Sequence, residues 1–153
     1  MERRVTFDAS CQYESAAYNA QDVNKLFGLS FGFGGVHRNS ARFGWRWNPA
    51  DQCIDLIAYC YVNGVRNQDA QLRFPVVLQV KIGECVWCHI GATFDMESGL
   101  PVYEFSAIAP GQRGGSKDVL RPEKLPGYGL THGFYFGGEL VAPHDTIVRI
   151  DRL

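Results

Sequence analysis

Alternating hydrophobic and polar side chains organise the middle of the chain. Over residues 37–47 every second side chain is mostly apolar, and the positions between them are mostly basic. Residues 54–62 show the same period, and the turn-forming residues 48–51 separate the two runs. A period of two is typical of a β-strand whose faces differ, so the sequence predicts a β-hairpin here.

The hydrophobic pattern also predicts how the two strands of this hairpin pair. A four-residue loop over 48–51 sets Trp47 opposite Gln52 and faces Trp45 with Ile54, so apolar side chains meet across one face. The reverse face then forms an arginine and tyrosine surface. Its predicted pairs are Arg38 with Tyr61, Ser40 with Tyr59, Arg42 with Ile57, and Arg46 near Asp55.

Further alternating runs predict most of the remaining strands. Pro75 has no amide hydrogen, so the strand that contains it lies at a sheet edge or bulges there. A three-residue loop at 83–85 would pair that strand with the next one. Many short strands between turns indicate an all-β, antiparallel β-sandwich of jelly-roll or lectin-like form as a single domain over residues 1–153. The predicted strands are residues 5–8, 37–47, 54–62, 72–82, 86–94, 102–108, 130–136 and 146–150.

Three segments lack a clear strand pattern. Residues 14–26 alone have some helical character, and their weak periodicity is compatible with a short helix or an ordered loop. Residues 28–35 are rich in glycine, but no Lys-Ser or Lys-Thr follows, so we expect a bend and not a phosphate-binding loop. Residues 109–128 carry several prolines and glycines and predict a long loop, which is usually functional or mobile.

Composition and charge narrow the function classes. The chain has 153 residues, 17 of them glycine, and 13% of its residues are aromatic, as expected for a turn-rich β protein. A net charge of -1 argues against nucleic-acid or anionic-membrane partners. No segment reaches the ~20 apolar residues of a membrane span, and residues 1–7 lack the apolar core of a signal peptide. A cytoplasmic location is therefore the default expectation.

The five cysteines predict no cofactor. Their odd number and wide spacing favour free thiols inside the core, Cys60 and Cys88 among them. Residues 85–89, Cys-Val-Trp-Cys-His, have the spacing of haem attachment in c-type cytochromes. However, this segment alternates as a strand, which puts Cys85 and Cys88 on opposite faces. We expect neither haem nor a zinc site.

Sequence motifs for nucleophilic catalysis are weak. The chain has no Gly-x-Ser-x-Gly elbow, and a cysteine nucleophile paired with His37 or His89 is unconstrained by the pattern. The pair His144 and Asp145 opens the last predicted strand. Asp145 could cap backbone amides of the turn, or the imidazole and carboxylate could lie at the rim of a groove.

Three arginines recur every four residues, so an extended strand would point Arg38, Arg42 and Arg46 the same way, about 13 Å apart. This spacing suits cross-strand pairs with Asp55 and tyrosines, or an extended acidic ligand such as a uronate polymer. Exposed aromatic side chains, including Trp87, could stack on sugar rings. The candidate ligand-binding residues are Arg38, Arg42, Arg46, Tyr59, Tyr61, Tyr135, His144 and Asp145.

Five sequence segments carry a resemblance that covers most of the chain. They are residues 24–28 (NKLFG), 39–45 (NSARFGW), 58–64 (AYCYVNG), and 135–138 (YFGG) together with 142–145 (APHD). This set resembles uncharacterised single-domain proteins of Bacteroidetes-type bacteria and their phages. The resemblance implies a β-sandwich and assigns no activity.

A more distant resemblance is to polysaccharide lyases of the jelly-roll type, in which an arginine-bearing strand and a late tyrosine-containing strand line the groove. Arg38, Arg42 and Tyr135 match that arrangement. The chain departs from it in lacking a Gln-Ile-His segment, and in carrying Gly137 where those enzymes have a lysine two residues after the tyrosine.

The sequence therefore favours a non-catalytic binding or structural domain whose ligand is a glycan or an acidic polymer. The alternative from another class is a carbohydrate-active enzyme, similar to polysaccharide lyases, that uses His144, Asp145 or Tyr135. A third alternative is an assembly protein of a phage or cell surface, in which one sheet face forms the interface of a homo-oligomer.

Overall fold

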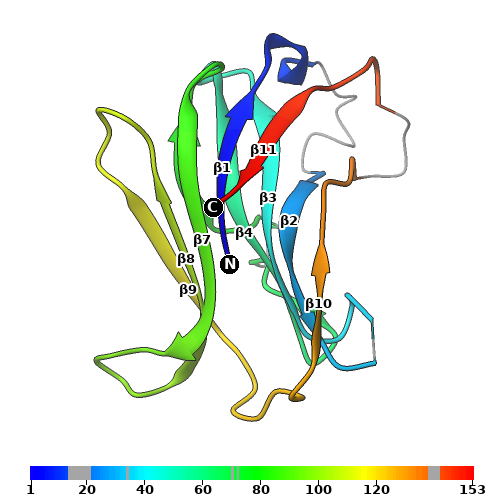
Figure 1. Cartoon of the computed structure of the whole chain (residues 1–153), viewed down its shortest axis with the longest axis vertical. Coiled ribbons are helices and arrows are strands. Elements are labelled where there is room, and N and C mark those ends of the chain that lie inside the picture. Colours follow the sequence, from blue (N-terminus) through cyan, green and yellow to red (C-terminus); the bar gives the residue numbers. More distant parts are fainter. Residues whose placement is uncertain (14–21, 34, 70, 72, 138–141) are drawn as a thin grey trace.

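The computed structural model describes residues 1–13, 22–33, 35–69, 71, 73–137 and 142–153. Over these residues the chain forms two antiparallel β-sheets packed face to face, with one short 3-10 turn at Ala9–Cys11 (Figure 1). The predicted all-β sandwich with at most one short helix is confirmed.

One sheet has five strands and is named here the five-stranded sheet. Both chain ends lie on it, because β1 pairs with β11 on one side and with β7 on the other. In spatial order its strands are β11 (Val148–Arg152), β1 (Glu2–Phe7), β7 (Cys85–Phe94), β8 (Pro101–Ile108) and β9 (Gly115–Leu120).

The second sheet, the six-stranded sheet, is built around the predicted hairpin. Two short strands share the outer side of β4, since both β5 and β6 pair with it. Its strands are β10 (Gly129–His132), β2 (Asn24–Phe31), β3 (Ser40–Asn48), β4 (Cys53–Val62) and β5 (Val65–Arg66), with β6 (Val76–Val80) beside β4.

Aromatic and branched side chains fill the space between the sheets. Phe43 of the six-stranded sheet meets Phe105 of the other sheet edge to face, with ring centroids 5.3 Å apart. Phe7 packs on Trp45 at 5.4 Å. All four side chains are fully buried, so the apolar face predicted for the hairpin is the core face.

The hairpin has the predicted faces but a different register. Trp45 lies opposite Leu56, where the pattern had predicted Ile54. The loop is also four residues long but begins one residue later, because Asn48 pairs with Cys53 and Gln52 takes a positive φ of 51°. Moving the loop by one residue shifts every pair by two, which leaves each side chain on its predicted face.

One predicted pairing and one predicted strand length are wrong in the strands that follow. The predicted strand at 72–82 is shortened to β6, and it does not pair with β7, because the two strands belong to different sheets. Pro75 lies just before β6, which among the strands that the structure describes pairs with β4 alone, so the predicted edge position is confirmed. The Pro75 carbonyl accepts a hydrogen bond from the Ala58 amide. The pairing of β4 with β6 has a register irregularity between Leu56 and Ile57.

Two strands, β2 and β9, were not predicted because they lie in or next to glycine-rich sequence. β2 covers the end of the segment 14–26, which was predicted as a helix or loop, and the start of the predicted bend at 28–35. Residues 14–21 of that predicted helix or loop lie outside the described residues. β9 lies inside the predicted loop at 109–128. The first residue of β9, Gly115, lies close to the backbone of Val77. Glycine is needed there because a side chain would collide with the carbonyl oxygen of Val77.

The cysteines are free thiols, as predicted. Four of them are buried, while Cys85 is exposed. Cys85 and Cys88 both belong to β7, where residues three apart point to opposite faces. Among the described residues, no helix has the length and apolar character needed to cross a membrane.

Candidate functional site

The outer face of the six-stranded sheet carries a groove of about 590 Å³, which we name the outer groove. Its walls come from β2, β3, β4, β5 and β10 and from the turns next to them. The residues that line it are Asp22, Lys25, Val36, His37, Arg42, Tyr59, Tyr61, Arg66, His132, Gly133 and Tyr135.

Lys25 and Tyr135 form one side of the outer groove. Their backbones exchange two hydrogen bonds of 2.8 Å, which extends the pairing of β10 with β2 beyond His132. The ammonium of Lys25 donates to the carbonyl of Val23 and lies 4.5 Å from the ring centroid of Tyr59. Burial, and then the nearby Arg42 charge, lower the pKa of Lys25 to about 8.

Arg42 projects from β3 into the floor of the groove. Its guanidinium carbon lies 4.9 Å from the Tyr59 ring centroid, so Tyr59 receives two cations on its ring. Arg42 is only 9% exposed, and its Nε has no hydrogen-bond partner among the described residues. Burial lowers the pKa of Arg42. A buried guanidinium N–H group without a hydrogen-bond partner costs folding free energy, which is typical of a ligand site.

Gly28 on the neighbouring strand makes room for Arg42. The two residues face each other in the β2 and β3 register. A side-chain carbon at Gly28 would lie 2.5 Å from Arg42 Cγ and would collide with the carbonyl oxygen of Ala41. The glycine therefore lets the arginine lie flat across the sheet.

Tyr59 and Tyr61 form the aromatic side of the groove on β4. Tyr59 is 5% exposed and stacks on Phe74 with ring centroids 4.7 Å apart. Tyr61 meets the imidazole of His37 at 5.0 Å. Burial and the neighbouring Tyr61 hydroxyl raise the pKa of Tyr59, so its phenol stays neutral at physiological pH.

His132 closes the groove from β10. Its Nε2 lies 2.7 Å from the hydroxyl oxygen of Ser30. Burial and the Arg42 charge lower the pKa of His132, which keeps the imidazole neutral at pH 7.

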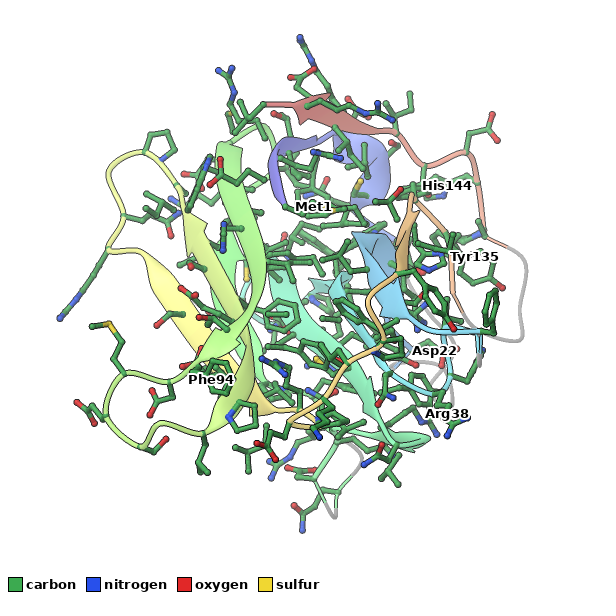
Figure 2. All side chains as sticks on the ribbon, turned by 60° about the horizontal axis from the view of Figure 1, so that its bottom comes forward. Met1, Asp22, Arg38, Phe94, Tyr135 and His144 are labelled. Atoms are coloured by element: carbon green, nitrogen blue, oxygen red, sulfur yellow. The ribbon has the colours of Figure 1, made fainter. Side chains whose placement is uncertain are left out.

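The outer groove concentrates positive charge in an almost neutral chain. Lys25, Arg42 and Arg66 contribute three cations, whereas Asp22 contributes one carboxylate. The whole chain has a net charge of -1. Figure 2 shows Asp22 between Tyr135 and Arg38 along one side of the molecule. This charge distribution favours an anionic ligand.

The predicted stripe of three arginines is not formed. Arg38 lies in the turn before β3 and is exposed, so it does not continue the strand. Arg46 donates to the carboxylate of Asp55 at 3.0 Å, and the side chains of Asn48 and Gln79 also bind that carboxylate. Arg46 therefore has a structural partner on β4, opposite to it in register.

His144 and Asp145 are not among the residues that line the outer groove. Both are exposed, and the His144 Nε2 donates to the backbone carbonyl of Ser10 at 2.7 Å. The Ser10 hydroxyl accepts the amide of Ile147 at 2.9 Å. This pair of bonds fastens the approach to β11 to the 3-10 turn.

The structure adds groove residues that the sequence pattern missed. Lys25 lay in the stretch predicted as helix or loop, and Arg66 lay in a polar segment without periodicity. His132 reaches the site only because β10 pairs with β2, more than ninety residues away in the chain. No local signal reports such a pairing, whereas the arginine and tyrosine alternation did indicate Arg42, Tyr59 and Tyr61.

Comparisons with known proteins support the fold. No protein-family model matches the chain, and no curated protein sequence matches it significantly. One solved structure is similar to this chain: the marine PL-14 alginate lyase from Aplysia kurodai, with a TM-score of 0.51 and 14% sequence identity. The match covers 98% of this chain and 66% of the lyase chain, so this chain spans slightly less than two thirds of the neighbour's length. At this identity the likeness shows a shared β-sandwich fold.

The arrangement can hold an extended anion. Cations at Lys25, Arg42 and Arg66 can bind carboxylates, and the rings of Tyr61 and Tyr135 can contact the apolar face of a sugar. Within the part of the chain that the structure describes, no cluster of three or more His, Cys, Asp or Glu side chains could hold a metal ion.

Proposed function

We propose that the outer groove binds an acidic polysaccharide. The single observation that carries the proposal is Arg42, a residue that is only 9% exposed, whose Nε has no hydrogen-bond partner and whose guanidinium has no carboxylate partner among the described residues. Buried charges are normally paired, so a ligand carboxylate is the natural partner of this one. Lys25 and Arg66 add positive charge on the same surface.

Three further features support a sugar polymer as the anion. The groove is lined by residues of five strands of the sheet, and its walls include exposed Tyr135 and half-buried Tyr61. Aromatic rings next to cations are suited to sugars, which have an apolar face and polar edges. The structural neighbour is an alginate lyase, whose name states that it acts on an acidic polysaccharide.

Binding to a panel of polysaccharides tests this function. Affinity electrophoresis or calorimetry would compare alginate, polygalacturonate and hyaluronate with the neutral polymers xylan and laminarin. We expect binding to at least one acidic polymer and none to the neutral ones. Arg42→Ala should weaken that binding at least tenfold, because a charge-assisted hydrogen bond contributes about 1.5–3 kcal/mol.

Arg149→Ala is the matched control for this substitution. Arg149 is an exposed arginine on β11 that pairs with Asp151 at 3.1 Å, and it lies on the other sheet. The control should bind as the wild type does. Equal binding by the Arg42 and Arg149 variants, or no binding to any acidic polymer, would refute the proposed function.

Cleavage by β-elimination is a second candidate function, favoured by the pKa of Lys25. In that reaction a base removes the proton next to the sugar carboxylate, a carbon–carbon double bond forms, and the glycosidic oxygen leaves with a proton. Arg42 would neutralise the carboxylate, the neutral amine of Lys25 would take the proton, and the Tyr135 hydroxyl would supply one. A pKa of about 8 leaves a useful fraction of Lys25 neutral near pH 7.5.

Ultraviolet absorbance of the unsaturated sugar product separates the two candidates. An acidic polymer that binds and gives a rise in absorbance, lost in Tyr135→Phe, would establish the lyase. Binding with no new double bonds or reducing ends would leave the groove as a binding site. The Tyr135→Phe variant keeps the ring, so its polymer binding should change less than twofold.

A further inference from the structure

A second cavity opens beside the outer groove. It has a volume of about 400 Å³, and we name it the loop cleft. The residues that line it are Phe31, Gly32, Phe33, Arg38, Asn39, Asn63, Pro122, Lys124, Pro126 and Tyr128. None of the residues predicted from the sequence except Arg38 belongs to it.

Two aromatic rings at the loop cleft are exposed to solvent. Phe33 is 94% exposed and Tyr128 is 48% exposed, and their ring centroids lie 4.5 Å apart. Gly32 fixes the chain between them through a positive φ of 80°, and its amide donates to the Tyr128 carbonyl at 3.3 Å. The two ring planes are tilted by 43°, and together the exposed rings form an apolar platform that the apolar face of a ligand can contact.

Polar groups for an acidic sugar surround this platform. Arg38 and Lys124 supply two cations. Asn39 is 8% exposed, and its side-chain oxygen accepts the Asn63 amide at 2.8 Å. This bond holds the amide of Asn39 in the wall of the cleft, where its side-chain nitrogen can donate to a ligand.

One turn joins the loop cleft to the outer groove. His37 lines the groove and its neighbour Arg38 lines the cleft. The Arg38 carbonyl accepts the Gly64 amide at 2.9 Å, which holds this turn against the end of β4. Arg38 lies in the turn just before β3, four residues ahead of Arg42 in the chain, so the two cavities follow one another along the same stretch of backbone.

We infer that the loop cleft is a second subsite for the same acidic polysaccharide, so that the ligand runs from Tyr135 through Arg42 and past His37 to the Phe33 and Tyr128 platform. This inference rests on the proposed function of the outer groove. It adds that recognition depends on ligand length: a short oligosaccharide fills only the outer groove, and a long one reaches both cavities.

Calorimetry with oligosaccharides of two lengths tests this inference. The probes are the disaccharide and the octasaccharide of alginate and of polygalacturonate, with the full chain as wild type, Phe33→Ala and Arg42→Ala. We expect Phe33→Ala to weaken octasaccharide binding about fivefold, as for loss of one aromatic contact, and to leave disaccharide binding unchanged. Arg42→Ala should weaken both.

Phe94→Ala is the matched control, because Phe94 is 55% exposed and Figure 2 shows it on the opposite side of the molecule from Arg38. This control should bind both lengths as the wild type does. If Phe33→Ala binds the octasaccharide normally while Arg42→Ala does not, the second subsite is refuted and the proposed function stands. If the wild type binds neither octasaccharide, or if Arg42→Ala binds both lengths normally, the two fail together.

Discussion

Arg42 and Arg46 show how two arginines on one strand acquire different roles. Arg46 lies opposite Asp55 and is neutralised by it at 3.0 Å. Arg42 lies opposite Tyr59, which offers a ring face and no negative charge. The register predicted from the sequence, which differs by two residues, would set Arg42 opposite Ile57, so the observed register is what places Arg42 against Tyr59 and Arg46 against Asp55.

Lys25 makes polyanion binding depend on pH. Its pKa of about 8 means that the amine loses its charge as the pH rises through 8. An anionic ligand binds the charged form better, so we expect affinity to fall about tenfold between pH 7 and pH 9. His132 and Tyr59 keep their neutral forms across this range, because the pKa of His132 is lowered and that of Tyr59 is raised.

Calorimetric titration of wild type and Lys25→Met over this pH range measures the effect. Methionine keeps most of the length of the lysine side chain and removes its charge. The variant should bind more weakly than the wild type at pH 7 and show a flat profile. A profile in Lys25→Met as steep as in the wild type would assign the titration to another group.

The β3 and β4 hairpin is fixed at its turn by a buried carboxylate. Asp55 is 2% exposed and accepts hydrogen bonds from Arg46, Asn48 and Gln79, which tie three strands together. Asp55→Ala leaves the half-buried Arg46 unpaired, so we expect the free energy of unfolding to fall by about 3 kcal/mol.

Denaturant unfolding followed by tryptophan fluorescence measures that loss. The matched control is Asp151→Ala, which removes an exposed carboxylate paired with Arg149. Exposed ion pairs contribute little, so the control should lose less than about 1 kcal/mol. Similar losses in both variants would contradict the structural role of Asp55.

Close approach between β2 and β3 predicts the effect of a larger residue at Gly28. In Gly28→Ala the new methyl group meets the side chain of Arg42 and the backbone of Ala41. We expect a loss of about 2 kcal/mol in the free energy of unfolding, together with weaker ligand binding, because the arginine must move.

Gly127→Ala provides the comparison, since no heavy atom outside its chain neighbours lies within 4 Å of a side-chain carbon at Gly127. Thermal unfolding and polymer affinity of this variant should match the wild type. A Gly28→Ala protein that unfolds at the wild-type temperature would show that β3 tolerates the methyl group without cost.

Strand faces were predictable from sequence, as was the pairing of β3 with β4, whereas the register of that hairpin and the partner of β6 were not. Alternation placed Phe43, Trp45 and Leu56 on the buried face because that pattern depends only on neighbouring residues. The register depended on where a four-residue loop begins, which a positive φ at Gln52 and the Asn48 side chain decide. β9 escaped prediction because Gly115 and its neighbours have the composition of a loop.

At the scale of the whole molecule, the outer groove depends on contacts between distant segments. Arg42, Tyr59 and Tyr61 come from the hairpin and were indicated by its pattern. Lys25 and Tyr135 meet through a single bridge between residues 110 positions apart, and nothing local in the sequence indicates it. Periodicity therefore predicted the fold class. Of the candidate site, it predicted only the aromatic residues and the arginine.

The sandwich also separates two different outer faces. The six-stranded sheet carries the cationic groove, while the outer face of the five-stranded sheet has Trp87 stacked on His89 with ring centroids 5.9 Å apart. His89 lies 3.4 Å from the Glu2 carboxylate, so that surface places a negative charge beside its aromatic side chains. An acidic polymer should therefore choose the six-stranded sheet.

Nuclear magnetic resonance tests the central claim most directly, because it reports where the ligand lies. The measurement is a titration of isotope-labelled protein with alginate and polygalacturonate octasaccharides, following backbone amides and the arginine side chains. We predict shifts on β2, β3 and β4 around Lys25, Arg42 and Tyr59, with the five-stranded sheet unaffected. Shifts centred on the five-stranded sheet, or no shifts with either oligosaccharide, would contradict the assignment of the outer groove as an acidic-polysaccharide site.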